Sequence, residues 1–162
     1  MELASLLQRI NSHYKQHLPF ILYSLPNKDS IKVCLQNDDT LYGMDSHINE
    51  SFIFAPFDYN KNPICIPLEK GETFTEAYLK KEVDHQEVEI KEEAKTREKY
   101  IKSIKNAISV IKNRNAIKIV ISRKKEIKLK QFDLKVLINR LLNLYPNAFR
   151  YVWYHPKTGL WC

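Results

Sequence analysis

Residues 116–130 read AIKIVISRKKEIKLK, and the fold predicted for the chain is organised around this stretch. Isoleucine and valine dominate residues 117–122, and apolar and charged residues alternate in residues 125–130. Such runs favour two short strands, here joined by a tight turn at residues 123–125. The sequence therefore predicts a β-hairpin that is entered from one helix and followed by another.

Lys118 stands inside the apolar run of the first predicted strand. Strand alternation places Lys118, Val120 and Ser122 on one face and the isoleucines on the other. If both faces of the sheet are covered, the ammonium loses hydration, and a desolvated lysine can act as a base. The competing interpretation is an edge-strand lysine whose ammonium stays in water, and the pattern alone favours this simpler interpretation.

The composition is that of a folded globular protein. The chain has 162 residues, of which 44% are hydrophobic and 28% are charged, so it can form a core. It has only three glycines and neither a GxGxxG nor a GxxxxGK[ST] pattern, which argues against a phosphate-binding loop. Because there is no signal-peptide pattern, no long apolar run and no CxxC pair, we expect a soluble, cytoplasmic protein without membrane contact.

The net charge of +7 admits two kinds of partner. A basic excess can bind nucleic acid or can attract a small anionic substrate. Lysine-rich surfaces without interleaved aromatic residues are most often simply solvated, so we expect no nucleic-acid partner. The alternative is a small basic protein that binds nucleic acid through residues 118–130, with an affinity that falls steeply as salt rises.

Periodicity and turn residues place the other elements. The first predicted helix covers residues 2–17, the second runs through Ile111 to a left-handed stop at Asn113 or Asn115, and the third runs from a cap at Asp133 to Pro146. Residues 37–50 are too irregular to assign. The other predicted strands cover residues 20–25, 31–36, 51–57, 62–68, 149–155 and 160–162.

A helix followed by a hairpin thus occurs three times, at residues 2–36, 95–130 and 133–162. This order predicts an α+β fold in which helices cover one side of a mostly antiparallel sheet. A composition shift in the charged residues 81–98 suggests a boundary near residue 90, which gives domains 1–90 and 91–162. Since the last hairpin has a return strand of only about three residues, we expect the chain to be the front part of a longer protein.

Other side chains that could carry chemistry have simpler interpretations. His13 and His17 are four residues apart on one helix, but no HExxH pattern accompanies them, so a metal site is not expected. Cys34 and Cys65 fit as small core residues. The aromatic residues of the last strand can stack on bases, but packing against the sheet is the more common role; these are Tyr151, Trp153 and Tyr154.

Three segments resemble one enzyme family. The segment IKIVISRK (residues 117–124), with the helix YIKSIKNAISVIKN before it, is similar to the "KVVLSR" segment of chorismate-utilising enzymes, in particular isochorismate synthases. FIFAPFD (residues 52–58) resembles a segment upstream in that family. LYPNAFRYVWYHPKTGLW (residues 144–161) resembles the stretch that leads to the family's GATPE-type signature. The three segments occur in the family's order.

The resemblance implies a mechanism and names one residue. In the isochorismate synthase branch, the lysine of this segment is the general base that activates water for attack on C2 of chorismate, and the position falls on Lys118. A glutamate of the GATPE-type signature protonates the departing C4 hydroxyl, and Mg²⁺ held by more distant glutamates binds the substrate carboxylate. Branches that use ammonia typically have glutamine at this position, so lysine favours the branch that uses water.

The departures from the family limit what these residues do alone. The chain ends before the GATPE-type signature, so the acid and the Mg²⁺ ligands have no counterpart in it. We therefore expect an inactive fragment, monomeric, of an isochorismate synthase for menaquinone or siderophore biosynthesis. A salicylate synthase-like enzyme shares the lysine and stays an alternative, as does a natural truncation kept as a non-catalytic partner.

Overall fold

The computed structural model describes residues 3–44, 50–58, 60–79 and 94–162. The chain forms two compact units, which we treat separately. Unit 1 comprises residues 1–83 and 133–162, and unit 2 comprises residues 84–132. The predicted boundary near residue 90 lies outside the described residues. The division into domains 1–90 and 91–162, which followed from composition, stays a prediction.

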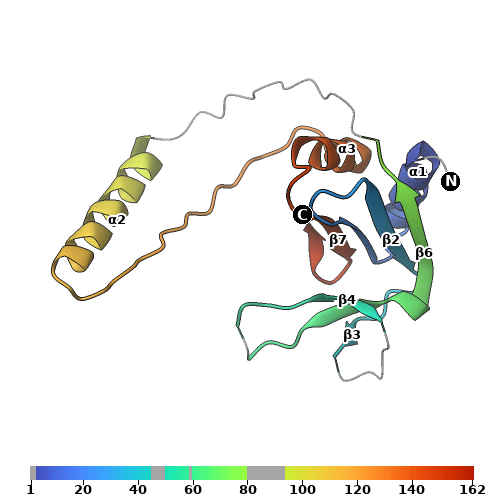
Figure 1. The fold of residues 1–162 in the computed structure, drawn as a ribbon, viewed down its shortest axis with the longest axis horizontal. Coiled ribbons are helices and arrows are strands. Elements are labelled where there is room, and N and C mark those ends of the chain that lie inside the picture. Colours follow the sequence, from blue (N-terminus) through green and yellow to red (C-terminus); the bar gives the residue numbers. More distant parts are fainter. Residues whose placement is uncertain (1–2, 45–49, 59, 80–93) are drawn as a thin grey trace. The chain divides into compact units, whose positions relative to one another are not determined.

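A five-stranded antiparallel sheet forms the centre of unit 1 (Figure 1). Its strand order is β6-β2-β1-β7-β8. The first hairpin supplies two central strands, and the last hairpin continues the sheet because Ile21 lies opposite Trp153. The strands are β1 (Phe20–Ser24), β2 (Ser30–Gln36), β6 (Gly71–Ala77), β7 (Arg150–His155) and β8 (Gly159–Trp161).

Two helices cover one face of this sheet. These are α1 (Leu3–Lys15) and α3 (Leu134–Leu144), each with the apolar stripe that its sequence predicts. Asp133 caps α3 as expected, since its carboxylate accepts hydrogen bonds from the backbone N–H groups of Lys135 (2.8 Å) and Val136 (3.2 Å). The stripes meet alternate residues of the central strands; the fully buried members of this core include Leu6, Ile10, Phe20, Leu22, Leu134, Ile138, Leu142 and Val152.

A three-stranded antiparallel sheet packs on the opposite face (Figure 1). Its order is β3-β5-β4, from β3 (Tyr42–Gly43), β4 (Ser51–Phe54) and β5 (Ile64–Pro67), and a short 3₁₀ turn, η1 (Leu68–Lys70), leads from β5 to β6. Phe54 stacks on the fully buried Trp153, with ring centroids 5.4 Å apart. Trp153 and Tyr151 of β7 therefore pack between the two sheets, whereas Tyr154 of the same strand packs in the core under the helices. All three pack against the sheet, as the simpler interpretation expected.

The described part of unit 2 contains one helix, α2 (Ala94–Lys112), and an extended segment that follows it. The hairpin predicted at residues 117–130 is wrong, because these residues form no strand in the structure. A strand needs a partner for its backbone hydrogen bonds, and an isolated two-stranded hairpin is only marginally stable in water. None of the strand pairs in the described residues includes this segment.

The stop of α2 also differs from the prediction. Arg114, rather than Asn113 or Asn115, adopts the left-handed conformation, with φ 57°. The N–H of Arg114 donates to the Ile111 carbonyl (3.0 Å), and the N–H of Asn115 donates to the Val110 carbonyl (3.1 Å). This pair of bonds is the Schellman motif, which fixes the left-handed position by geometry even where no glycine or asparagine stands there.

The fold class predicted from sequence is confirmed. The described chain is α+β, its sheets are antiparallel, and helices cover one face of the larger sheet. The first and third helix–hairpin units form as predicted, whereas the second keeps only its helix. Among the described residues, no helix has the length and apolarity needed to cross a lipid bilayer.

Candidate functional site

Lys118 lies in the extended segment between α2 and α3 and is exposed to solvent. Its neighbours Ile117 and Val120 are 100% and 80% exposed, whereas Ile119 is 38% exposed, so the described part of unit 2 covers this stretch only in part. The covered sheet that would desolvate Lys118 is therefore not formed by the residues that the structure describes. The sequence alone suggested a solvated lysine, and that is how its side chain lies here.

The segment beyond Lys118 makes contacts at the surface of unit 2. The guanidinium of Arg123 lies over the ring of Tyr100, 5.0 Å from its centre, which brings the segment back toward the first half of α2. The ammonium of Lys124 and the carboxylate of Glu126 form an exposed ion pair at 2.6 Å. Both contacts are at the surface, where such interactions contribute little to stability. These contacts tie the segment to α2 at one point but do not bury it.

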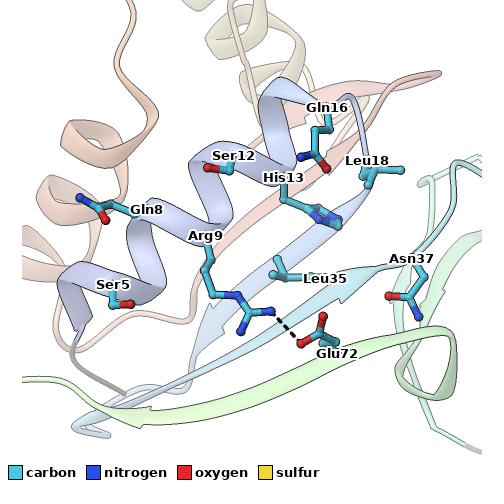
Figure 2. Close-up of a pocket in the computed structure, with 10 residues that line it drawn as sticks. All are labelled: Ser5, Gln8, Arg9, Ser12, His13, Gln16, Leu18, Leu35, Asn37 and Glu72. Carbon is cyan, nitrogen blue, oxygen red and sulfur yellow. Dashed lines mark hydrogen bonds and ion pairs between the residues drawn. The ribbon is translucent and has the colours of Figure 1, made fainter.

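A second candidate site is a polar groove in unit 1, between α1 and the strands β2 and β6 (Figure 2). Its volume is about 540 Å³, within the range of ligand pockets. Arg9 crosses the groove to pair with Glu72 (Nη2–Oε2 2.7 Å), and its guanidinium lies over the Phe74 ring at 4.6 Å. The groove is lined mainly by serine and amide side chains; these are Ser5, Gln8, Ser12, Gln16 and Asn37.

His13 is the histidine that lines this groove. Burial lowers its pKa below the ordinary 6.5, and Arg9 lowers it further, while the carbonyls of Pro19 and Gln36 and the charge of Glu72 act the other way. Its Nε2 lies 3.0 Å from the Pro19 carbonyl oxygen and donates to it in the neutral form of the ring. His13 is therefore a neutral hydrogen-bonding group at pH 7, already engaged by the backbone.

His13 and His17, the pair considered above as possible metal ligands, have different hydrogen-bond partners in the structure. The Nδ1 of His17 lies 3.3 Å from the Tyr154 hydroxyl, whereas His13 bonds to the backbone. Over the described residues, no group of three histidine, cysteine, aspartate or glutamate side chains is close enough to hold a metal ion. The described residues thus offer no three-ligand protein site for a magnesium ion. Cys34 and Cys65 are buried, as expected.

Sequence reasoning missed the groove because it missed β6. Residues 71–77, GETFTEA, hold one aromatic and two β-branched residues among charged ones, which is a weak strand signal. The ion pair joins Arg9 to Glu72, 63 residues apart in the chain. Only the pairing of β6 with β2 brings these two side chains together, with Glu72 opposite Leu35.

The comparison with protein families identifies the class of protein. The family model described as "Chorismate binding enzyme" matches residues 58–160, well over half of the chain. The chain belongs to the chorismate-binding enzyme family. No similar curated protein and no similar solved structure was found. The matched range includes Lys118 and β6–β8, whereas α1, which forms one wall of the groove, lies outside it.

Proposed function

We propose that this chain carries the general base of an isochorismate synthase-type reaction and that Lys118 is that base. The supporting observation is that the family match spans residue 118, where IKIVISRK has the lysine of the water-using branch. Family membership supports a chorismate-utilising function in general. The choice of isochorismate as product rests on the resemblance and on this lysine.

In the proposed reaction, the neutral amine of Lys118 takes a proton from water, and the water oxygen bonds to C2 of chorismate. The ring double bonds shift, and the C4 hydroxyl leaves as water after protonation by an acid. A general base contributes about 10²–10⁴-fold on its own. The acid and the Mg²⁺ of the family have no assigned residue in this sequence, which has no GATPE-type motif. The product would feed menaquinone or siderophore synthesis.

The charge around Lys118 suits this substrate. Thirteen lysines and arginines but only two glutamates lie in residues 94–130. Chorismate is a dicarboxylate, and a field of one sign raises the local concentration of an oppositely charged ligand. Because a hydrated ammonium is a poor base, the active state requires the stretch around Lys118 to be covered.

The test is a kinetic comparison in the full gene product that contains these residues. With chorismate and Mg²⁺, we expect isochorismate, and we expect Lys118→Ala to lower kcat by about 10²–10⁴-fold because the general base is lost. Lys128→Ala is the matched control, since it removes an exposed cation of the same segment and leaves the base. Product analysis by chromatography separates isochorismate from salicylate.

Full activity in Lys118→Ala would refute the assigned role. Equal decreases of kcat in Lys118→Ala and Lys128→Ala would show that Lys118 contributes only its positive charge, as Lys128 does. Salicylate as the released product would replace the synthase proposal with the salicylate-forming alternative and would leave the base role in place.

A further inference from the structure

The polar groove between α1 and the strands β2 and β6 takes no part in the proposed reaction. Every residue that lines it belongs to unit 1, so unit 1 alone forms the groove. The family match does not explain the α1 wall, because α1 lies outside the matched residues. The groove follows α1 from Ser5 to Gln16, which is roughly 16 Å of helix at about 1.5 Å per residue. A ligand longer than a single sugar ring therefore fits along it.

The charges that line the groove cancel. Arg9 and Glu72 form an ion pair across it at 2.7 Å, and His13 is neutral at pH 7. The other lining residues are uncharged. An ionic ligand needs an unpaired group of opposite charge to replace its hydration, and the groove offers none among these residues. The charge balance therefore favours a neutral ligand.

The polar side chains of the groove still have hydrogen-bonding capacity. Within the described residues, the ion pair uses only Nη2 of Arg9 and Oε2 of Glu72, so other N–H groups and Oε1 stay open to a ligand. Figure 2 shows Arg9 and His13 reaching from α1, with Glu72 and Asn37 on the side of the strands. The carboxamide of Asn37 adds two N–H donors and one acceptor. Donors next to acceptors suit adjacent hydroxyl groups, because each hydroxyl both donates and accepts.

Leu18 and Leu35 add apolar surface to the same groove. A sugar ring has C–H faces that pack on apolar side chains, while its hydroxyl groups form hydrogen bonds at the edge of the ring. A purely apolar ligand would leave the arginine, carboxylate and amide groups without partners, which is costly. The lining thus matches a carbohydrate in both its polar and its apolar parts.

We infer that this groove binds a short neutral oligosaccharide through vicinal hydroxyl groups, with Arg9, Glu72 and Asn37 as the hydrogen-bonding residues. The length of the groove favours linked rings over a monosaccharide. The inference goes beyond the proposed function, because it involves neither Lys118 nor chorismate.

The probe is maltotriose, titrated into the purified, ¹⁵N-labelled chain and followed by the amide resonances of α1, β2 and β6. We expect saturable shifts along the groove, with weaker binding of glucose. Arg9→Met should weaken maltotriose binding by about tenfold, because hydrogen bonds to a charged group are lost while the apolar stem over Phe74 is kept. Lys15→Met is the matched control, since Lys15 is an exposed cation of α1 that does not line the groove.

Two further variants separate recognition from folding. Asn37→Ala should also weaken maltotriose binding, and it leaves the backbone bond from the N–H of Asn37 to the Lys70 carbonyl in place. Glu72→Gln should weaken maltotriose binding and strengthen citrate binding, because it leaves the charge of Arg9 unpaired. Circular dichroism checks that each variant is folded.

Three other probes can overturn the inference; they are tetraethylene glycol, citrate and uridine. Equal binding of the glycol would show that hydroxyl groups are not recognised. Tighter binding of citrate or of uridine than of maltotriose would make the groove an anion site or a nucleoside site instead. An absence of shifts with maltotriose, or equal effects of Arg9→Met and Lys15→Met, would also contradict it. None of these outcomes bears on the chorismate assay.

Discussion

His155 is fully buried at the end of β7 and has both ring nitrogens engaged. Its Nδ1 accepts the backbone N–H of Lys157 (3.1 Å), which leaves the proton on Nε2, 3.4 Å from the Thr40 carbonyl oxygen. Burial is the main cause that lowers the pKa of His155 below 6.5, and Lys157 adds to it, while the Thr40 carbonyl and Asp39 oppose it. The fold of unit 1 therefore holds a neutral histidine.

We predict that the free energy of unfolding falls as the pH falls below 6.5. Above 6.5, the imidazole is neutral in both the folded and the unfolded chain. Below it, the unfolded chain binds a proton that the folded chain resists, so stability is lost progressively down to the lower folded pKa. His13 acts in the same direction. Urea unfolding at a series of pH values measures the slope.

The variant His155→Gln should flatten this slope, and His17→Gln is the control because His17 is exposed. Since glutamine keeps a donor for the Thr40 carbonyl, the comparison concerns the proton more than the packing. An unchanged slope in His155→Gln would contradict the assignment.

Arg114 shows that the conformational preference of a single residue does not determine where a helix ends. Asparagine tolerates the left-handed conformation better than arginine, so the sequence favoured Asn113 or Asn115 as the stop. The structure uses the residue between them, with φ 57°. The register of the last helical hydrogen bonds determines the position, and this register depends on the length of the helix rather than on one residue. A stop region could be predicted, but the exact residue could not.

At the scale of elements, Gly71 shows how closely β6 approaches β2. A Cβ on Gly71 would come within 2.3 Å of the Leu35 carbonyl oxygen and within 2.9 Å of the Cys34 sulfur. We predict that Gly71→Ala destabilises the protein by about 1–3 kcal/mol, because backbone atoms must shift to admit the methyl group. Urea unfolding monitored by circular dichroism measures the change.

Gly43→Ala is the matched control. Among the described residues, no atom other than those of its chain neighbours lies within 4 Å of a Cβ at that position, so the substitution should change the free energy of unfolding by much less. Equal effects of the two substitutions would contradict the close approach at Gly71.

The contrast between β6 and the segment after α2 explains where element prediction succeeds. Residues 117–122 have a strong strand pattern and form no strand, whereas residues 71–77 have a weak pattern and form one. β-Structure depends on a partner edge, and β2 offers its edge to β6. Helices bond within themselves, so all three predicted helices are present. The strands of unit 1 could be predicted where a hairpin places the pairing strand close by in the sequence.

At the scale of the whole molecule, the two units differ in how much of their helices they bury. α1 and α3 bury leucine and isoleucine in a shared core, whereas Ile101, Ile108 and Ile111 of α2 are exposed. Because most helical stability in proteins comes from packing of an apolar face, α2 should open more easily than the sheet.

Amide hydrogen exchange followed by mass spectrometry tests this difference. We predict that peptides from α2 exchange much faster than peptides from β1, the central strand of the larger sheet. Equal protection of α2 and β1 would show that the apolar stripe of α2 is covered in solution, contrary to the described structure.

The candidate site was predictable only through resemblance. Patterning placed Lys118 in a strand that does not form, and it gave no sign of the groove around Arg9. The family match then supports a chorismate-utilising function for the range that includes Lys118. A catalytic role depends on groups that lie far apart in the sequence, so the pattern of one segment cannot predict it.

The most direct test of the central claim follows the oxygen atom. The full gene product is incubated with chorismate in water enriched in heavy oxygen, and the product is analysed by mass spectrometry. Activation of water by Lys118 predicts isochorismate with a labelled oxygen at C2, and formation of this product falls by about 10²–10⁴-fold in Lys118→Ala. Unlabelled isochorismate, or labelled product at an undiminished rate in Lys118→Ala, would contradict it.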